Sequence, residues 1–340
     1  MNYKNVLITK IGGPNVLQIV HPPLHAPADN ETRIRILYTG VGFTDILMRY
    51  GNYLYAPKIP FAPGYEIVGV VDAVGKSVTG ISVGQRVAAL TVHGGYAEYI
   101  YLPPEKLIPV PEGVEAFEAV SLILNYVTAY QMLHRVAHVQ EGQTILITGA
   151  SGGVGNALLQ LGQLAGLKTM YGLTSKKKRD LVIQLGGVPI EYATTDFLDF
   201  VRSRELHGID AVFEGIGGNF AVRGYRALQR GGILVSFGVT GAIKNNKANK
   251  FSSFVSYITP AILNVLPDGK RATFYGITRL YRKDPKPFRE DLVKLFQLLA
   301  EGKIKPVVAA VLPLSEATKA HEMLERGDVQ GKLVLRCSES

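Results

Sequence analysis

Three glycines follow one apolar segment of the sequence at a regular spacing. Gly149, Gly152 and Gly155 come after the apolar run TILIT, residues 144–148, and lead into apolar side chains at helical spacing. Between a strand and a helix, glycines let the backbone turn sharply and approach a pyrophosphate, whose charge the amides at the helix start bind. The pattern predicts a dinucleotide-binding turn, with a merely structural turn as the alternative. The residues assigned to it are Gly149, Ser151, Gly152, Gly153, Val154 and Gly155.

A basic run follows the next expected strand. The segment GLTSKKKRD, residues 172–180, closes that strand without the Asp or Glu that holds the adenosine ribose in NAD-binding proteins. A carboxylate there would repel a 2′-phosphate, whereas Ser175, Lys176 and Lys177 can bind one through charge-assisted hydrogen bonds. We therefore expect NADPH as the cofactor. The alternative is a solvated helix start, since runs of charge are usually solvated.

The composition excludes several classes of protein. The 340 residues include one cysteine, Cys337, which excludes a disulfide framework and a cysteine-based zinc site. The first residues lack the apolar core of a signal peptide, and no apolar run is long enough to cross a bilayer, so we expect a cytoplasmic protein without membrane insertion. With 37 basic and 28 acidic side chains the formal charge is +9, which favours anionic cofactors or polyanions without choosing between them.

Two regions with different strand patterns must position these residues. Short β-type runs separated by glycine and proline fill the first 120 residues and indicate a barrel-like antiparallel domain. From about residue 125, apolar strands alternate with helix-like segments up to about residue 264, which indicates a parallel, doubly wound sheet. The remaining sequence contains one amphipathic helix and a last strand, KLVLR. The sequence is therefore that of an α/β protein with two domains.

Over its whole length the sequence resembles the medium-chain dehydrogenase/reductase superfamily, in particular its zinc-free quinone oxidoreductase branch. The matching stretches are GVGFTDILMRYGNY, PGYEIVGVVDAVG, LNYVTAYQML, TGASGGVG, GGILVSFG and GKLVL. The resemblance implies a GroES-like β-barrel catalytic domain over residues 1–124 and 266–340. It also implies a Rossmann domain, with a doubly wound parallel sheet that binds NADPH, over residues 125–265.

The resemblance also bears on metal binding. It places Gly42, Tyr65 and Leu124 at the positions that hold the catalytic zinc in the alcohol dehydrogenases of the superfamily, and none of these side chains is a zinc ligand. His134 and His138 have i, i+4 spacing, but no third ligand is near them, so we expect no metal. Without a Lewis acid, alcohol oxidation is disfavoured. Hydride addition to a conjugated acceptor needs only a hydrogen-bond donor near the developing oxyanion.

Candidate residues near the reacting atoms follow from the same resemblance. Tyr53 matches a Gly-x-Tyr tyrosine of the family and is the candidate catalytic donor, with an aromatic pocket wall formed together with Tyr50 and Tyr55 as the alternative. Gly42 stands where quinone reductases usually carry asparagine, which widens the cleft and argues against a strict quinone preference. Asp45 is expected to serve in a helix cap. The other assignments are Asn125 and Thr128 near the nicotinamide, Tyr192 at the adenosine phosphate and Gly238 at the cofactor.

Together these features predict an NADPH-dependent reductase that transfers a hydride to a small-molecule quinone or α,β-unsaturated carbonyl. The alternatives are an enoyl-thioester reductase and a protein that binds NADPH without turnover. The apolar segment 251–267 could line a wide substrate entrance or serve as core or dimer-contact material. Nucleic acid is not expected as a partner, because the basic stretches 244–250 and 279–289 accompany no recognition motif. We expect a homodimer, with an edge strand in 274–281 as the place of pairing.

Overall fold

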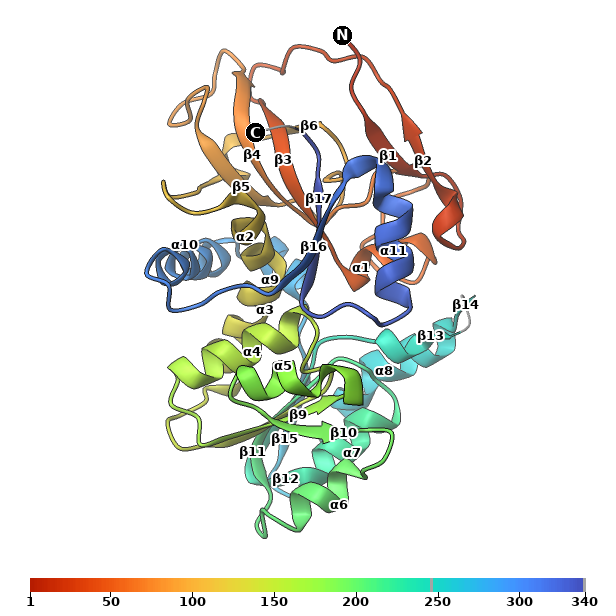
Figure 1. Cartoon of the computed structure of the whole chain (residues 1–340), viewed down its shortest axis with the longest axis vertical. Coiled ribbons are helices and arrows are strands. Elements are labelled where there is room, and N and C mark those ends of the chain that lie inside the picture. The colour runs from red at the N-terminus through yellow and green to blue at the C-terminus, as the bar shows by residue number, and fades with distance from the viewer. Residues whose placement is uncertain (245–246, 339–340) are drawn as a thin grey trace. The chain divides into compact units, whose positions relative to one another are not determined.

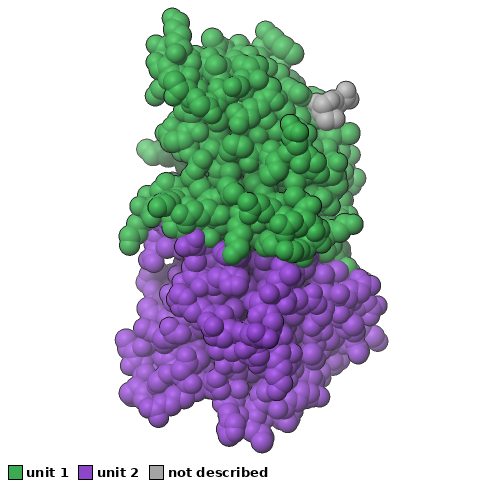
Figure 2. All heavy atoms as spheres, turned by 90° about the vertical axis from the view of Figure 1, so that its left-hand side faces the viewer, with its two compact units in different colours: residues 1–127, 281–340 green, residues 128–280 purple. Residues whose placement is uncertain are grey.

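The computed structural model describes residues 1–244 and 247–338, and the chain divides into two units. Unit 1 consists of Met1–Val127 and Tyr281–Ser340, and unit 2 of Thr128–Leu280 (Figure 2). The first division falls close to the expected one at 124–125. The second follows residue 280 rather than 265, because strand β15 (Arg271–Phe274) belongs to the sheet of unit 2.

Unit 2 is built on a six-stranded sheet in the described part of the chain, and every neighbouring pair of its strands is parallel (Figure 1). The order β10-β9-β8-β11-β12-β15 is that of a doubly wound fold, in which the order of the strands reverses between β8 and β11. The apolar run TILIT forms β8, as predicted. The strands are β8 (Thr144–Ile147), β9 (Thr169–Thr174), β10 (Val188–Glu191), β11 (Ile209–Glu214), β12 (Leu228–Ser236) and β15.

Helices cover both faces of this sheet. On one face, Gly162 of α4 packs so closely on β9 that an added Cβ would lie 2.5 Å from the sulfur of Met170. On the other face, Leu146, Val212 and Leu234 pack in one core with α6 and α7. The helices of unit 2 include α4 (Gly153–Leu164), α5 (Arg179–Gln184), α6 (Phe197–Arg202), α7 (Asn219–Ala227) and α8 (Lys250–Leu263), and a two-stranded sheet of β13 (Ile243–Lys244) and β14 (Lys247–Ala248) precedes α8.

The edge of the parallel sheet differs from the predicted edge. Of the expected segment 274–281, only Phe274 lies in β15, and the chain then turns into helix α9 (Ile277–Lys283). The edge strand therefore begins at Arg271, earlier than the sequence pattern indicated.

Unit 1 contains a seven-stranded sheet in the described residues, in the order β16-β17-β3-β4-β5-β7, with β6 also paired to β3. All its pairs are antiparallel except β16 with β17, so the last strand of the chain, KLVLR, joins the N-terminal strands. A separate hairpin joins β1 (Asn5–Ile8) and β2 (Leu17–Val20). The sheet strands are β3 (Thr32–Val41), β4 (Glu66–Val74), β5 (Arg86–Leu90), β6 (Tyr99–Leu102), β7 (Ile108–Pro109), β16 (Val308–Pro313) and β17 (Lys332–Arg336).

The helical part of unit 1 includes the amphipathic helix that the sequence predicts near its C-terminal end. This is α10 (Lys286–Ala300), whose Leu292 and Leu295 are buried and whose end is followed by Gly302 at a positive φ of 68°. On either side of the division at Val127 the chain forms a π-helical segment, and such segments are frequent at functional sites. The helices of unit 1 include α1 (Phe43–Arg49), α2 (Ala116–Ser121), π-helix η3 (Leu122–Tyr126), α10 and α11 (Ala317–Glu325). Helix α3 (Val127–Tyr130) begins at the last residue of this part of unit 1, and π-helix η4 (Gln131–Ala137) belongs to unit 2. No helix in the described ranges is both long and apolar enough to cross a membrane.

Candidate functional site

The three glycines after β8 meet three different demands of the backbone. Gly149 has a φ of +64°, the left-handed conformation that favours glycine. A Cβ on Gly155 would lie 2.4 Å from the carbonyl oxygen of Gly149, so helix α4 can approach the strand only without a side chain there. Gly152 is the N-cap of α4 and brings no capping side chain to the first amides of the helix. This division of roles is the one expected of a turn that binds a dinucleotide pyrophosphate.

Several buried polar atoms at the carboxyl end of the parallel sheet have no hydrogen-bond partner among the described residues. They are Oδ1 of Asn156 in the first turns of α4, Oε2 of Glu214 at the end of β11 and Oγ of Ser236 at the end of β12. Buried polar atoms are nearly always hydrogen-bonded, and ligands of doubly wound sheets bind at the carboxyl ends of the strands. The unmet atoms therefore fit a polar ligand at this edge.

Glu214 also shows how strongly this edge is shielded from water. Its Oε1 accepts hydrogen bonds from the N–H groups of Ile216 at 2.5 Å and Gly217 at 2.8 Å. Burial nevertheless raises the pKa of Glu214 to about 7, because desolvation outweighs both bonds. A carboxyl group with such a pKa changes its charge close to neutral pH.

The basic run lies at the end of β9, on the same edge of the sheet. Ser175 follows the strand, and Lys176–Lys178 form a short 3-10 turn before α5. Lys176 and Lys177 are exposed and form no ion pair with a described residue, whereas Arg179 pairs with Glu191 at 3.3 Å. The two lysines thus present positive charge beside the glycine turn, to which β9 is joined by a hydrogen bond of 3.2 Å between the hydroxyl groups of Thr174 and Ser151.

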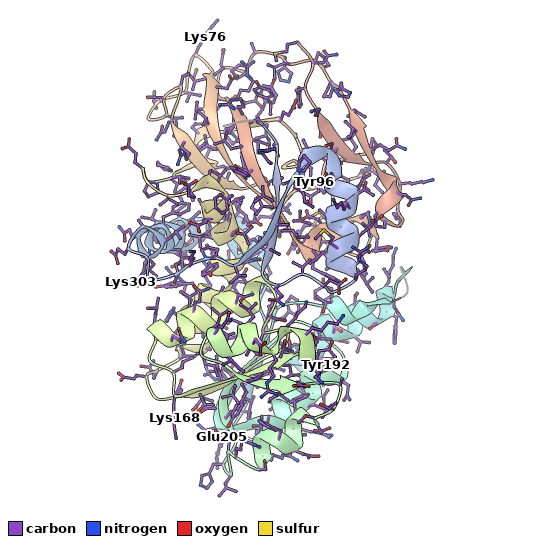
Figure 3. The ribbon with its side chains drawn as sticks, viewed as in Figure 1. Lys76, Tyr96, Lys168, Tyr192, Glu205 and Lys303 are labelled. Atoms are coloured by element: carbon purple, nitrogen blue, oxygen red, sulfur yellow. The ribbon has the colours of Figure 1, made fainter. Side chains whose placement is uncertain are left out.

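The two other residues assigned to the cofactor also lie at the strand ends. Tyr192 follows β10 and is exposed (Figure 3). Its backbone N–H donates to the carbonyl of Thr174 at 3.3 Å. Gly238 follows β12, where a Cβ would lie 2.6 Å from the carbonyl oxygen of Gly215. Gly238 is therefore required by the close approach of two loops, and any contact it makes to a ligand comes from its backbone.

In unit 1 the fold brings Gly42 and Leu124 together, two of the three positions compared with the zinc ligands of alcohol dehydrogenases, and it places Leu124 beside the neighbour of the third. A Cβ on Gly42 would lie 3.4 Å from Cδ2 of Leu124, and the N–H of Leu124 donates to Glu66, the neighbour of Tyr65, at 2.6 Å. The same Cβ would lie 3.1 Å from Oγ1 of Thr44. A side chain at position 42 would therefore lie against Thr44 and Leu124.

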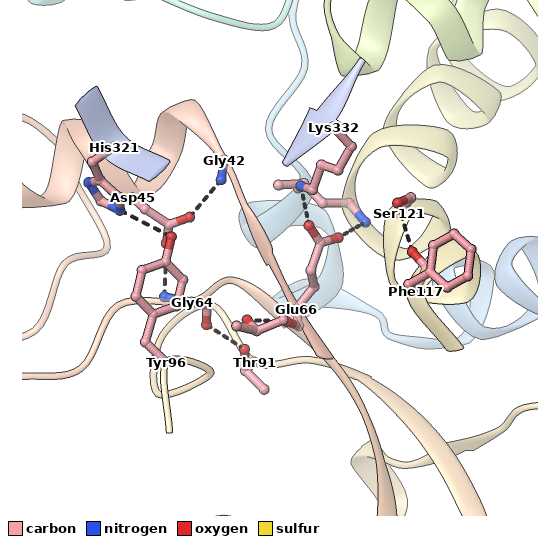
Figure 4. Close-up of polar contacts among 12 residues, drawn as sticks. Gly42, Asp45, Gly64, Glu66, Thr91, Tyr96, Phe117, Ser121, His321 and Lys332 are labelled. Carbon is pink, nitrogen blue, oxygen red and sulfur yellow. Dashed lines mark hydrogen bonds and ion pairs between the residues drawn. The ribbon is translucent and has the colours of Figure 1, made fainter. Parts of the chain in front are cut away.

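Both carboxylates near these positions are occupied by protein groups. Asp45 accepts the N–H of Gly42 at 2.8 Å and that of Gly64 at 2.9 Å, which makes it the capping residue of α1 that the sequence predicts (Figure 4). Glu66 accepts from Leu124 and forms an ion pair with Lys332. Burial raises the pKa of Asp45 to about 6 and that of Glu66 as well, because desolvation is the largest effect in each. Neither side chain is arranged to coordinate a cation.

The histidine pair does not supply a metal site either. His134 belongs to η4, but His138 ends that helix in a left-handed conformation with a φ of 53°, so helical spacing no longer relates the two rings. Within residues 1–244 and 247–338, no group of three or more His, Cys, Asp and Glu side chains could hold a metal ion. The residues present therefore do not fit the zinc of the alcohol dehydrogenases.

Two tyrosine hydroxyl groups occupy the corresponding region of unit 1. Oη of Tyr53 lies 2.5 Å from Oη of Tyr65, and one of the two donates to the other. Tyr65 is fully buried and Tyr53 is half-buried. The ring of Tyr53 also packs edge-on against Tyr55, with 5.9 Å between the centroids, whereas Tyr50 is buried against the guanidinium of Arg49. Tyr53 can thus both donate a hydrogen bond and form part of an aromatic wall.

The hydroxyl groups of Thr44 and Tyr65 were not among the site residues predicted from the sequence. Thr44 lies two residues after Gly42, and its Oγ1 is buried without a hydrogen-bond partner in the described structure. For Tyr65 the sequence indicates only that the position cannot bind zinc. The signal available for Thr44 was its place between two residues already noted, Gly42 and Asp45.

The residues Asn125 and Thr128 are both buried, the first in η3 and the second in α3.

Known proteins resemble the chain over nearly its whole length. The family model for the alcohol dehydrogenase GroES-like domain matches residues 28–112, and the model for zinc-binding dehydrogenases matches residues 185–335. The human synaptic vesicle membrane protein VAT-1 homolog-like is 30% identical over 336 residues, which cover 97% of this chain and 80% of that protein. The chain belongs to the medium-chain dehydrogenase/reductase superfamily. The match to the zinc-binding dehydrogenase family, residues 185–335, does not include Gly42, Tyr65 or Leu124.

Other members of the superfamily extend the comparison. Quinone oxidoreductase from Pongo abelii is 27% identical over 337 residues, which cover 97% of this chain and 96% of that protein. The crystal structure of the human VAT-1 homolog-like protein has a TM-score of 0.85 at 27% identity and covers 100% of this chain and 99% of its own. A mycobacterial protein solved in complex with NADPH has a TM-score of 0.84 at 28% identity, with 98% and 99% covered. The predicted fold class, a GroES-like domain with a Rossmann domain, and the oxidoreductase class are confirmed.

Proposed function

We propose that the protein is an NADPH-dependent reductase that transfers a hydride to a quinone or an α,β-unsaturated carbonyl without zinc. The observation that carries the proposal is the pair of tyrosine hydroxyl groups, Tyr53 and Tyr65, at 2.5 Å in the region where related enzymes hold zinc. Hydrogen-bond donors suffice for a conjugated acceptor, because its developing charge is spread over an enolate or quinol anion.

The proposed cofactor rests on features of unit 2. The glycine turn leaves the first amides of α4 available to a pyrophosphate, and the end of β9 carries Ser175, Lys176 and Lys177 in place of a carboxylate. The mycobacterial relative was solved with NADPH, which supports the same cofactor here. When bound, NADPH supplies the hydride. We assign the 2′-phosphate to the serine and the lysines, with Tyr192 beside the adenosine.

The residues of unit 1 act on the acceptor. We propose that Tyr65 donates to Tyr53 and that Tyr53 donates to the carbonyl or quinone oxygen, whose charge grows as the hydride arrives. The buried hydroxyl of Thr44, which lacks a protein partner in the described structure, is a second donor for a ligand oxygen. Asp45 and Glu66 hold the surrounding backbone through Gly42, Gly64 and Leu124 and do not take part in the reaction.

An enoyl-thioester reductase is the second candidate. The structure of the CurK enoyl reductase has a TM-score of 0.81 at 25% identity and covers 98% of this chain and 99% of its own. The same hydride chemistry serves both substrate classes, because an enoyl thioester is also a conjugated carbonyl.

The expected homodimer remains a prediction. The edge strand β15 offers less for pairing than an open edge would, because the N–H of Ala272 already donates to Oδ1 of Asn264 at 2.9 Å. Sedimentation velocity at micromolar concentration distinguishes a dimer from a monomer.

A screen of NADPH oxidation tests the proposed function. The purified protein is assayed with a naphthoquinone, an enal, an enone and an enoyl thioester, with and without a chelator, and its zinc content is measured. We expect turnover of at least one conjugated acceptor, insensitive to chelation, with no stoichiometric zinc. Tightly bound zinc whose removal abolishes turnover would overturn the zinc-free assignment. NADPH binding without turnover of any acceptor would instead identify a protein that only binds the cofactor.

A further inference from the structure

Helix α8 buries three hydroxyl-bearing side chains together with Pro260 and Leu263, and it exposes a row of large apolar side chains. Ser253 and Ser256 are only 2% and 3% exposed, whereas Phe251 and Phe254 are 75% and 60% exposed. A surface helix ordinarily buries its apolar stripe and presents its polar residues to water. The inverted arrangement is held in place on the inner side, where Oγ of Ser256 accepts the N–H of Gly218 at 3.1 Å.

The outward residues form one continuous stripe. They recur at intervals of three and four residues, which places them on one side of the helix and of the turn that follows it. Figure 1 shows α8 at the outer edge of unit 2, next to β13 and β14. The members of the stripe are Phe251, Phe254, Ile258, Ile262 and Val265, all exposed, with Leu266 beside them. A row of large exposed apolar side chains of this kind marks a surface that another apolar body covers.

The charges around the stripe are positive. Residues 248–267 contain no Asp or Glu, and Lys250 stands at the first position of the helix. Lys250 precedes the stripe and Arg271 follows it, and both are exposed without an ion pair to any described residue. The nearest acid beyond the helix, Asp268, accepts a hydrogen bond from Tyr225 at 2.7 Å. Of the basic stretch 244–250, Asn245 and Asn246 lie outside the described residues.

We propose that α8 is a membrane-surface helix, which docks the protein onto anionic phospholipid bilayers with its apolar stripe inserted between the headgroups. An apolar face flanked by lysine and arginine is the pattern of helices that lie in the interface of a bilayer. With 14 residues α8 is about 21 Å long, too short to cross the hydrocarbon core, so it lies on the membrane and does not span it.

A second copy of the chain is a poorer match for the same face. Two copies would bring together surfaces that both carry a surplus of positive charge. The adjacent edge strand β15 does not extend such an interface, because Asn264 of the segment after α8 occupies the N–H of Ala272. An anionic membrane satisfies both the apolar stripe and the flanking charge. The proposal thus adds docking of this surface onto a bilayer to a chain whose described helices include none that could span one.

Vesicle sedimentation with the full-length protein tests the proposal. We expect binding to phosphatidylcholine vesicles that contain about one third phosphatidylserine, weak binding to phosphatidylcholine alone, and weaker binding at high salt. The variant Phe254→Ser with Ile262→Ser should bind the anionic vesicles at least about tenfold more weakly. Serine, phenylalanine and isoleucine have similar helix propensities, so the helix itself should persist.

Matched substitutions outside α8 provide the control. Like the α8 variant, Leu164→Ser with Leu206→Ser replaces two exposed apolar side chains of unit 2 by serine. It should leave vesicle binding within about twofold of that of the original protein. An unchanged thermal unfolding midpoint shows that each variant is folded. Equal binding by all three proteins, or no binding of the original protein to anionic vesicles, would overturn the proposal. If the α8 variant instead turns a dimer into a monomer in sedimentation velocity without any vesicle binding, a second copy covers the stripe.

Discussion

Lys332 and Glu66 form an ion pair inside unit 1, with both side chains buried. The lysine comes from β17, near the end of the chain, and the glutamate from the start of β4. The second oxygen of Glu66 accepts the N–H of Leu124 at 2.6 Å. One carboxylate therefore fixes three separate parts of the sequence around the proposed active site. Burying the two charges costs desolvation free energy, which their mutual attraction offsets. If one partner is removed, the other remains as an uncompensated buried charge.

Removal of Lys332 alone should therefore be strongly destabilising. Lys332→Met leaves Glu66 buried without its cation, and we expect a loss of about 3–5 kcal/mol in the free energy of unfolding. Urea unfolding followed by circular dichroism measures it. The double variant Lys332→Met with Glu66→Gln should regain part of this loss, because the amide oxygen can still accept from Leu124 and no charge is buried. A double variant as unstable as the sum of its single changes would contradict this account.

A buried histidine should make stability depend on pH. Nδ1 of His321 accepts from Nη1 of Arg49 at 3.0 Å, so the neutral ring carries its proton on Nε2, which donates to Oη of Tyr96 at 3.0 Å. Burial first, and then the charge of Arg49, lower the pKa of His321 from 6.5 to about 3. Between these values the unfolded chain binds a proton that the folded chain does not. Stability is therefore full above pH 6.5 and falls as the pH drops toward 3, by a few kcal/mol in all.

The variant His321→Gln isolates this effect. Asp45 acts in the opposite sense, because its pKa is raised from 3.8 to about 6 and stability falls as the pH rises through that window. Both proteins contain Asp45, so its effect cancels in the comparison. We expect His321→Gln to be less stable at pH 7 and to lose less further stability on acidification, in urea unfolding at a series of pH values. Parallel pH profiles would show that His321 titrates as it does in the unfolded chain.

The proposed donor can be tested by removal of a single oxygen. Tyr53→Phe keeps the ring and its packing against Tyr55 but deletes the hydroxyl 2.5 Å from that of Tyr65. We expect kcat to fall about ten- to a hundredfold while the KM for NADPH stays unchanged. Tyr55→Phe is the matched control and should leave kcat nearly unaltered. A similar kcat for Tyr53→Phe and the original enzyme would reduce Tyr53 to a wall of the pocket.

The sequence predicted a feature correctly where a single residue meets a local backbone requirement by itself. The glycine turn was predictable, because Gly149 and Gly155 each meet a local backbone requirement that other residues cannot meet. Strand β15 was misplaced, since its four residues, RATF, begin with a charge and show no apolar run. The sequence marked the segment 251–267 as apolar, yet an apolar composition does not tell which face of a helix points inward.

Local sequence patterns did not predict which side chains from separate segments contact one another. The sequence pointed to Tyr53 by its resemblance to a family motif, but nothing in the spacing indicated that Tyr65 would lie against it. Their hydroxyl groups meet because the loop after α1 folds back onto the start of β4, where Gly64 donates its N–H to Asp45 of that helix. Long-range packing of this kind decides which hydroxyl groups face one another.

The end of β9 gives the last prediction, which concerns the choice of cofactor. NADPH and NADH differ only in the 2′-phosphate, which we assign to Ser175, Lys176 and Lys177. Both lysines are exposed after β9 without a carboxylate partner among the described residues. Charge-assisted hydrogen bonds are worth about 1.5–3 kcal/mol each, so Lys176→Ala with Lys177→Ala should raise the KM for NADPH about ten- to a hundredfold. The KM for NADH should change little, and so should kcat at saturating NADPH, because neither lysine acts on the reacting atoms.

Steady-state kinetics with both cofactors measure this effect, and a matched variant controls for the loss of two charges. Lys168 precedes β9 at the opposite end of the strand, and Lys286 lies in unit 1. Lys168→Ala with Lys286→Ala therefore lowers the net charge equally and should leave both KM values nearly unchanged. Equal weakening toward NADPH and NADH in the test variant would mean that the lysines support the fold of the strand end. If neither KM moves, the basic run is a solvated helix start and the 2′-phosphate is recognised elsewhere.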